Sequence, residues 1–184
     1  MYKKFDDVKE ALQTMQRMTN LQAQHNLLRT DLNELMQVTE ERLKTHIKND
    51  AFIRACISEL FTLIESDVHF VNLISPLEEY DDWDVFIDRF KDVFKAHCKN
   101  HEYENIYNNF ASRNLSDFKL LRDKRNKITH PKEKIDTAVD VQLFQKVKKV
   151  FSAYTKFVVD IMTGTGVEFS TNSLSEFTNA FRNL

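Results

Sequence analysis

An arginine and a histidine stand five residues apart near the end of a predicted helix, in the segment Arg125-Asn126-Lys127-Ile128-Thr129-His130-Pro131. A guanidinium stays protonated at any working pH, and an imidazole with a reference pKa of about 6.5 can take up and return a proton near neutrality. Cleavage of RNA without a metal needs such a pair, one group for the 2'-hydroxyl proton and one for the charge that develops on the phosphoryl oxygens. Asn126 lies one helical turn before His130 and could hold the imidazole by a hydrogen bond. We therefore take Arg125, Asn126 and His130 as the candidate catalytic residues.

Arg125 interrupts the apolar stripe of its predicted helix, which is made of Phe118, Leu121 and Ile128. A guanidinium on a half-buried face needs a carboxylate, a subunit partner or a bound anion to offset its desolvation. Glu65, on the most apolar predicted helix, is the candidate counter-ion, and Glu59 on the same helix is the alternative. The sequence does not choose between these two acids.

The candidate catalytic residues lie in a locally basic segment of a chain whose net charge is -2. From Lys119 to Lys134 there are seven Lys or Arg and two Asp or Glu, a local net charge of +5. Affinity for a phosphate backbone comes from such local charge and not from the whole-chain balance. The candidate substrate-binding residues are Arg122, Lys124, Lys127 and Lys132. The alternative is an ordinary solvated helix face.

The composition favours an all-α protein. Of 184 residues, 42% are hydrophobic and 15 are Phe, enough for a core, whereas 2 Gly and 2 Pro leave few obligatory turn positions. Cys56 and Cys98 are expected to be buried thiols, because two cysteines lack the density of a disulfide scaffold. His97, Cys98, His101 and Glu102 supply no convincing third ligand for zinc, so we expect no metal and no cofactor.

The spacing of apolar residues divides the chain into three regions. Residues 1–48 form an N-terminal helical extension, one long helix or a helical hairpin, that docks on the rest of the chain or on a second copy. Residues 49–163 form an up-and-down helical bundle, and residues 164–184 form a short helical tail. Within the bundle we expect helices at about 51–74, 83–98, 102–111, 117–129 and 136–162, with Ser116 as the N-cap of the fourth.

No membrane segment or secretion signal is expected. The first residues turn acidic at Asp6 and Asp7, where a signal peptide needs an apolar run, and 18 successive apolar residues occur nowhere. We therefore expect a soluble, cytoplasmic protein.

Helices of this kind, with Arg125-Asn126-x-x-x-His130 just before the last long helix, resemble the HEPN superfamily, whose hallmark is Arg, a polar residue, a short spacer and His. The resemblance covers roughly residues 51–162. It implies a helical bundle that dimerises so that two such motifs face each other across one cleft, with Arg125, Asn126 and His130 in the roles of the family's motif residues. Several toxins of the family carry a Tyr two places after the His, where this chain has Lys132.

Many HEPN proteins are metal-independent endoribonucleases of toxin-antitoxin, phage-defence and RNA-processing systems. The resemblance therefore implies RNA as substrate, a 2',3'-cyclic phosphate as product, a homodimer with a composite active site, and a protein partner or antitoxin that restrains the activity. Other members are inactive and serve as nucleotide-binding or interaction modules. A non-catalytic helical module for interaction or nucleotide binding is accordingly the alternative function.

Overall fold

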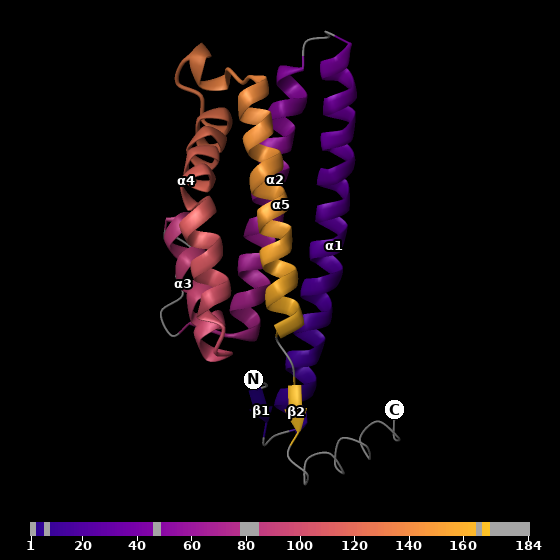
Figure 1. The fold of residues 1–184 in the computed structure, drawn as a ribbon, viewed down its shortest axis with the longest axis vertical. Helices are drawn as coiled ribbons and strands as arrows, with labels where there is room; N and C mark the ends of the chain where they lie inside the picture. Colours follow the sequence, from indigo (N-terminus) through magenta and orange to yellow (C-terminus); the bar gives the residue numbers. More distant parts are fainter. Residues whose placement is uncertain (1–2, 6–7, 46–48, 78–84, 165–166, 170–184) are drawn as a thin grey trace.

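The computed structural model describes residues 3–5, 8–45, 49–77, 85–164 and 167–169, and it has an all-α architecture, as predicted. The elements are β1 (Lys3–Phe5), α1 (Val8–Lys44), α2 (Asp50–Ile74), α3 (Phe86–Asn100), α4 (Glu104–Thr129), the 3-10 turn η1 (Lys134–Thr137), α5 (Val141–Gly164) and β2 (Val167–Phe169). The α-helices run along one long axis as an up-and-down bundle (Figure 1). β1 and β2 form a short parallel pair at one end of it, with Lys3 opposite Val167. Of the predicted helical tail at 164–184, Gly164 ends α5 and residues 167–169 form β2 and not a helix, and the rest lies outside the described residues.

The core lies between α2, α3, α4 and α5 and is rich in phenylalanine. Phe118 on α4 and Phe90 on α3 have ring centroids 4.7 Å apart, and Phe61 on α2 lies 5.5 Å from Phe118. Phe110 and Phe157 stack at 4.5 Å between α4 and α5. All these side chains are buried. Burial of so much aromatic surface is the main term that holds the four helices together.

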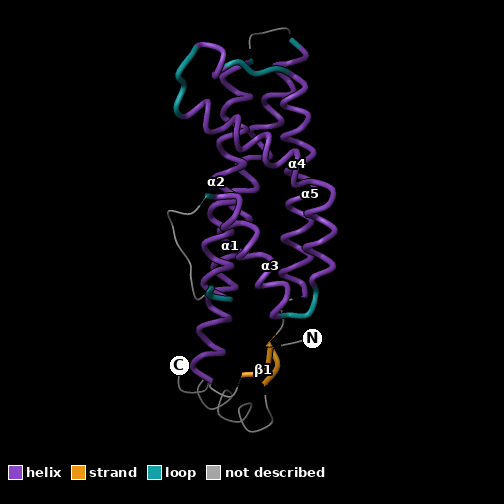
Figure 2. Tube along the Cα trace, turned by 90° about the vertical axis from the view of Figure 1, so that its left-hand side faces the viewer, coloured by secondary structure: helices purple, strands orange, loops and turns teal. Residues whose placement is uncertain are grey.

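The N-terminal region is one long helix that belongs to the same core as the helices after it. Along one side of α1, buried or half-buried positions recur every three or four residues: Ala11, Thr14, Met18, Leu21, His25, Leu28, Leu32, Leu35 and Thr39. This spacing gives a narrow seam along one side of the helix. Leu21, Leu32 and Met36 join the main hydrophobic cluster, and α1 runs beside α2 over most of its length (Figures 1 and 2). The expected docking on the rest of the chain is therefore confirmed.

Two predicted helix boundaries are wrong. α4 is one continuous helix, so the expected break before Ser116 does not exist and Ser116 is an exposed interior residue. The buried stripe runs through Phe110, Asn114 and Phe118 without interruption, and Asp117 bonds lysines of α5 instead of beginning a helix. The last helix begins at Val141 and not near Asp136, which belongs to η1.

Asp140 explains the true start of α5. Its Oδ1 accepts a hydrogen bond of 2.7 Å from the backbone N–H of Leu143, which is the interaction of an N-cap residue. None of the helices in the described ranges combines the length and the hydropathy that a bilayer span requires.

Candidate functional site

His130 is the first residue after α4, and its side chain is exposed at that end of the bundle. Its backbone N–H donates to the carbonyl oxygen of Asn126 at 2.9 Å, the last bond of the helix. Its backbone then leaves helical geometry, with φ of -127° and ψ of 61°, because Pro131 disfavours the helical region for the residue before it. The imidazole is therefore open to solvent at the helix end, where the sequence predicted it.

Arg125 points toward α2 and lies against Glu65. The Nη2 atom of Arg125 is 3.4 Å from Oε1 of Glu65, and both side chains are about one third exposed. Of the two candidate acids, Glu65 is the one in contact, whereas Glu59 is exposed on the same helix without a bond to Arg125. The half-exposed position limits the contribution of this pair to stability to about 1 kcal/mol or less.

Within one chain Arg125 and His130 have different surroundings. Residues five apart on an α-helix differ by roughly 140° about its axis, so their side chains leave it in different directions. Among the described residues, no hydrogen bond or ion pair joins Arg125, Asn126 or their neighbours to the imidazole of His130, and Asn126 reaches it only through the backbone. One chain alone thus presents the two groups of the motif separately.

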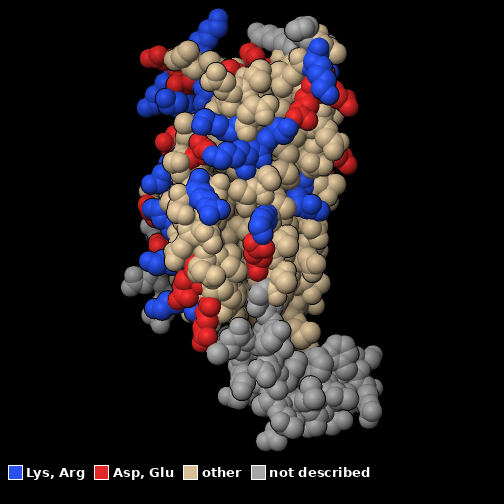
Figure 3. All heavy atoms as spheres, in the orientation of Figure 1, with Lys and Arg blue, Asp and Glu red and all other residues tan. Residues whose placement is uncertain are grey.

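The candidate substrate-binding cations have a mixed environment. Lys124 Nζ donates to the carbonyl oxygen of Asp136 at 3.0 Å, and Arg122 pairs with Asp123 at 3.2 Å. Lys127 and Lys132 are exposed. Lys and Arg side chains gather in the upper half of the face that Figure 3 shows, but acidic residues are interspersed among them. The local charge of +5 is partly offset by Glu65, which folding brings to Arg125.

The connection after His130 is organised by Asp136. Its Oδ2 accepts backbone N–H bonds from Lys132 at 2.9 Å and from Glu133 at 3.0 Å. These two bonds hold the pKa of the Asp136 carboxyl below its usual range. The ionised carboxylate therefore fixes the backbone that carries Lys132, two residues beyond the imidazole.

Sequence reasoning missed a buried polar cluster made of His25, Asp67 and Tyr154. The Oδ2 of Asp67 lies 2.8 Å from Nδ1 of His25 and accepts a hydrogen bond of 2.8 Å from the Tyr154 hydroxyl. Burial raises the pKa of the Asp67 carboxyl. Burial and the neighbouring Asp67 carboxyl together raise the pKa of the Tyr154 hydroxyl. A signal existed for Asp67, because it occupies a position in the otherwise apolar buried stripe of α2.

His97 and His101 are packed inside the bundle. His97 Nδ1 lies 2.8 Å from the Ser75 hydroxyl, and the rings of His97 and His101 have centroids 4.6 Å apart. Burial lowers the pKa of His97 to about 3. Cys56 and Cys98 are free buried thiols, as expected, and burial raises the pKa of Cys98 to about 12.

Comparisons of the chain with protein-family models, with curated proteins and with solved structures find no match. The functional assignment must therefore come from the residues and their geometry.

Proposed function

We propose that this protein is a metal-independent endoribonuclease of the HEPN type that works as a homodimer in the cytoplasm, in defence or under the control of an antitoxin-like partner. The observation that carries the proposal is the exposure of His130 at the end of α4, five residues beyond an arginine that Glu65 holds in a half-buried position. An accessible imidazole and an oriented guanidinium at one end of a rigid bundle are what cleavage of a phosphodiester requires.

In the proposed reaction His130 takes the proton from the ribose 2'-hydroxyl. The 2'-oxygen then attacks the adjacent phosphorus, the bond from phosphorus to the 5'-oxygen breaks, and the leaving oxygen takes up a proton. The products are a 2',3'-cyclic phosphate and a free 5'-hydroxyl. Arg125 stabilises the charge that develops on the phosphoryl oxygens, a contribution of roughly 3 kcal/mol for comparable groups.

The separation of Arg125 from His130 within one chain supports a composite site. One imidazole cannot easily act as base and acid on opposite sides of an in-line displacement. In a dimer, the His130 of each chain would supply one of these two roles, and Arg125 of one chain would act beside His130 of the other. The exposed Lys127 and Lys132 would bind flanking phosphates.

The alternative is a non-catalytic helical interaction module. Two observations favour it. Glu65 already offsets the charge of Arg125, and within one chain Arg125 and His130 do not contact each other. Such a module would use the same surface to bind another protein and would leave RNA intact.

The test is cleavage of labelled single-stranded RNA in EDTA by the wild type and by His130→Ala and Arg125→Ala. The proposal predicts that both variants lose cleavage by at least roughly a hundredfold while circular dichroism stays unchanged. Matched controls are His69→Ala and Arg113→Ala, because both side chains are exposed and lie outside the motif. Equal cleavage by His130→Ala and His69→Ala would refute the assignment, and absence of cleavage by the wild type would leave the interaction module.

A further inference from the structure

α1 lies on the flank of the bundle and adds little to its aromatic core. It packs chiefly against α2 and less against α5, and it runs along one side of the other helices (Figure 1). The sequence of α1 contains no Phe, Tyr or Trp, whereas the ring contacts of the core join α2, α3, α4 and α5 to one another. These four helices therefore share a core that is largely their own.

The seam between α1 and α2 is mixed in character. On α1 the buried residues are of two kinds, hydrophobic and polar: Ala11, Leu21, Leu32 and Met36, and Thr14, His25 and Thr39. On α2 the buried residues are hydrophobic except for Asp67. Polar groups in a seam reduce the apolar area that holds two helices together. α1 is therefore attached less firmly than the helices that share the aromatic core.

Polar contacts fasten α1 at several points along its length. Near its start, Nη1 of Arg17 donates to the carbonyl oxygen of Leu73 at 2.6 Å. Near its end, Glu40 bonds Lys148 of α5, and both of these side chains are more than one third exposed. An exposed ion pair of this kind contributes little, because water competes for both groups.

The bond between His25 and Asp67 differs from these contacts, because both side chains are almost fully buried. A buried carboxylate that loses a donor loses more free energy than an exposed one, so this bond resists separation of α1 from α2. When α1 moves away, Asp67 still accepts the hydrogen bond of Tyr154. In the described part of the chain, Nε2 of His25 and Oδ1 of Asp67 have no hydrogen-bond partner, and opening would expose both atoms to water.

We propose that α1 is a strap that opens from α2 while α2, α3, α4 and α5 stay folded, with the bond between His25 and Asp67 as its latch. β1 precedes α1 and pairs with β2, and the chain after α1 leads into α2. The strap is thus attached at both ends, and an open α1 stays beside the bundle and can close again. Native proteins open in such units where an element buries few apolar contacts.

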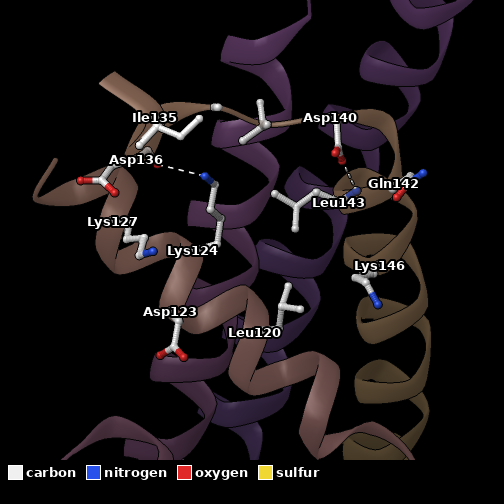
Figure 4. A pocket seen from close by; sticks show the side chains of 12 residues that line it. Leu120, Asp123, Lys124, Lys127, Ile135, Asp136, Asp140, Gln142, Leu143 and Lys146 are labelled. Carbon is white, nitrogen blue, oxygen red and sulfur yellow. Dashed lines mark hydrogen bonds between the residues drawn. The ribbon is translucent and has the colours of Figure 1, made fainter. Parts of the chain in front are cut away.

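Opening of the strap leaves the candidate functional site in place. The contact between Arg125 and Glu65 joins α4 to α2. The open groove of about 980 Å³ beyond it is formed by α4, α5 and the connection between them, including η1, and no residue of α1 lines it (Figure 4). The inference therefore does not rest on RNA cleavage, and it is tested without RNA.

The two cysteines report separately on the strap and on the bundle. Sγ of Cys56 on α2 lies 3.4 Å from Oγ1 of Thr39, so this thiol is covered by α1. Cys98 on α3 lies beside Tyr107 of α4, inside the bundle. Both thiols are fully buried. A reagent in solution therefore reaches Cys56 when α1 opens, but reaches Cys98 only when the bundle itself opens.

The experiment measures the rates at which both thiols of the native full-length chain react with N-ethylmaleimide, by mass spectrometry of the peptides. Each rate is divided by that of the denatured chain. The reagent is kept at concentrations where the rate is proportional to concentration, so that the rate reports the population of the open form. In the wild type Cys56 should react at least roughly tenfold faster than Cys98.

Phe118→Leu separates the two openings, because Phe118 contacts rings of α2 and α3 and no ring of α1. It weakens the bundle and should speed Cys98 by about tenfold while the rate of Cys56 stays unchanged. An equal acceleration of both thiols would overturn the inference, because α1 would then open only together with the bundle. So would a wild type in which Cys56 reacts no faster than Cys98.

His25→Ala tests the latch. It should speed Cys56 by about tenfold or more, because the lost bond involves a buried carboxylate. His25→Gln, whose amide can still donate to Asp67, should give a rate between those of His25→Ala and the wild type. Asn26→Ala is the matched control, with an exposed side chain on the same helix, and should change neither rate. If His25→Ala left the rate of Cys56 at the wild-type value, the bond would not be the latch.

Discussion

The Nδ1 atom of His25 lies 2.8 Å from the Oδ2 atom of Asp67 inside the bundle, so one buried carboxylate joins α1 to α2. Tyr154 donates to the same oxygen at 2.8 Å and adds α5 to the junction. All three side chains are almost fully buried. A buried polar group that loses its partner keeps the full penalty of its desolvation, so this cluster ties the position of α1 to the core.

Replacing the central acid should therefore destabilise the fold strongly. Asp67→Ala leaves His25 and Tyr154 without their shared acceptor and should lower the free energy of unfolding by about 3–5 kcal/mol, measured by urea denaturation. Asp31→Ala, an exposed acid on α1, should change it by less than about 0.5 kcal/mol. Tyr154→Phe should cost less in the Asp67→Ala background than in the wild type. Additive effects would show that the hydroxyl and the carboxylate do not depend on each other.

Acid should destabilise the protein through His97. Its pKa is about 3 in the fold against 6.5 for an unperturbed histidine, so the unfolded chain binds the extra proton first as the pH falls. The stability contributed by neutral His97 is complete above pH 6.5 and is lost as the pH falls toward 3, at up to about 1.4 kcal/mol per pH unit. The difference in unfolding free energy between wild type and His97→Gln should shrink by about 2 kcal/mol from pH 7 to pH 5. The same comparison with His69→Gln, an exposed histidine, should show no such change.

Phe118 holds α4 against two other helices, with Phe90 at 4.7 Å and Phe61 at 5.5 Å. Phe118→Ala opens a cavity in the core and should lower the free energy of unfolding by about 3–5 kcal/mol. Leu27→Ala, on the outer side of α1 where the leucine is 57% exposed, should cost less than about 0.5 kcal/mol. Thermal denaturation followed by circular dichroism measures both. A small effect at Phe118 would mean that the core rearranges to fill the space.

The contact between Glu65 and Arg125 should matter more for catalysis than for stability. At 3.4 Å and with both side chains about one third exposed, its loss in Glu65→Ala should cost less than about 1 kcal/mol of stability. If Arg125 acts on RNA, losing its support should slow cleavage by at least roughly tenfold, because small displacements of a catalytic group are costly. Glu59→Ala is the matched control on the same helix, with an exposed side chain. If Glu65→Ala and Glu59→Ala cleaved RNA at equal rates, Glu65 would have no role in positioning the Arg125 guanidinium.

Local patterns in the sequence were enough to predict the class of fold and the position of the Arg125–His130 motif at the end of a helix. The scarcity of Gly and Pro and the recurrence of apolar residues at helical spacing are properties of short segments, and they correctly predict an all-α protein with the core helix at 51–74. Pro131 likewise predicts that His130 stands at a helix end. The same local signals failed at Ser116 and Asp136, because the continuous buried stripe of α4 and the cap at Asp140 outweigh single residues with cap propensity.

Contacts between distant segments were decided only by the tertiary structure. Asp67 is 42 residues from His25 and 87 from Tyr154 in the chain. Helical periodicity predicts which face of its own helix a residue occupies, but not which face of another helix it contacts. The choice of Glu65 over Glu59 as the neighbour of Arg125 depends on how α2 and α4 pack. The packing of the helices results from many small contacts made by all of them together. No single stretch of sequence therefore specifies it.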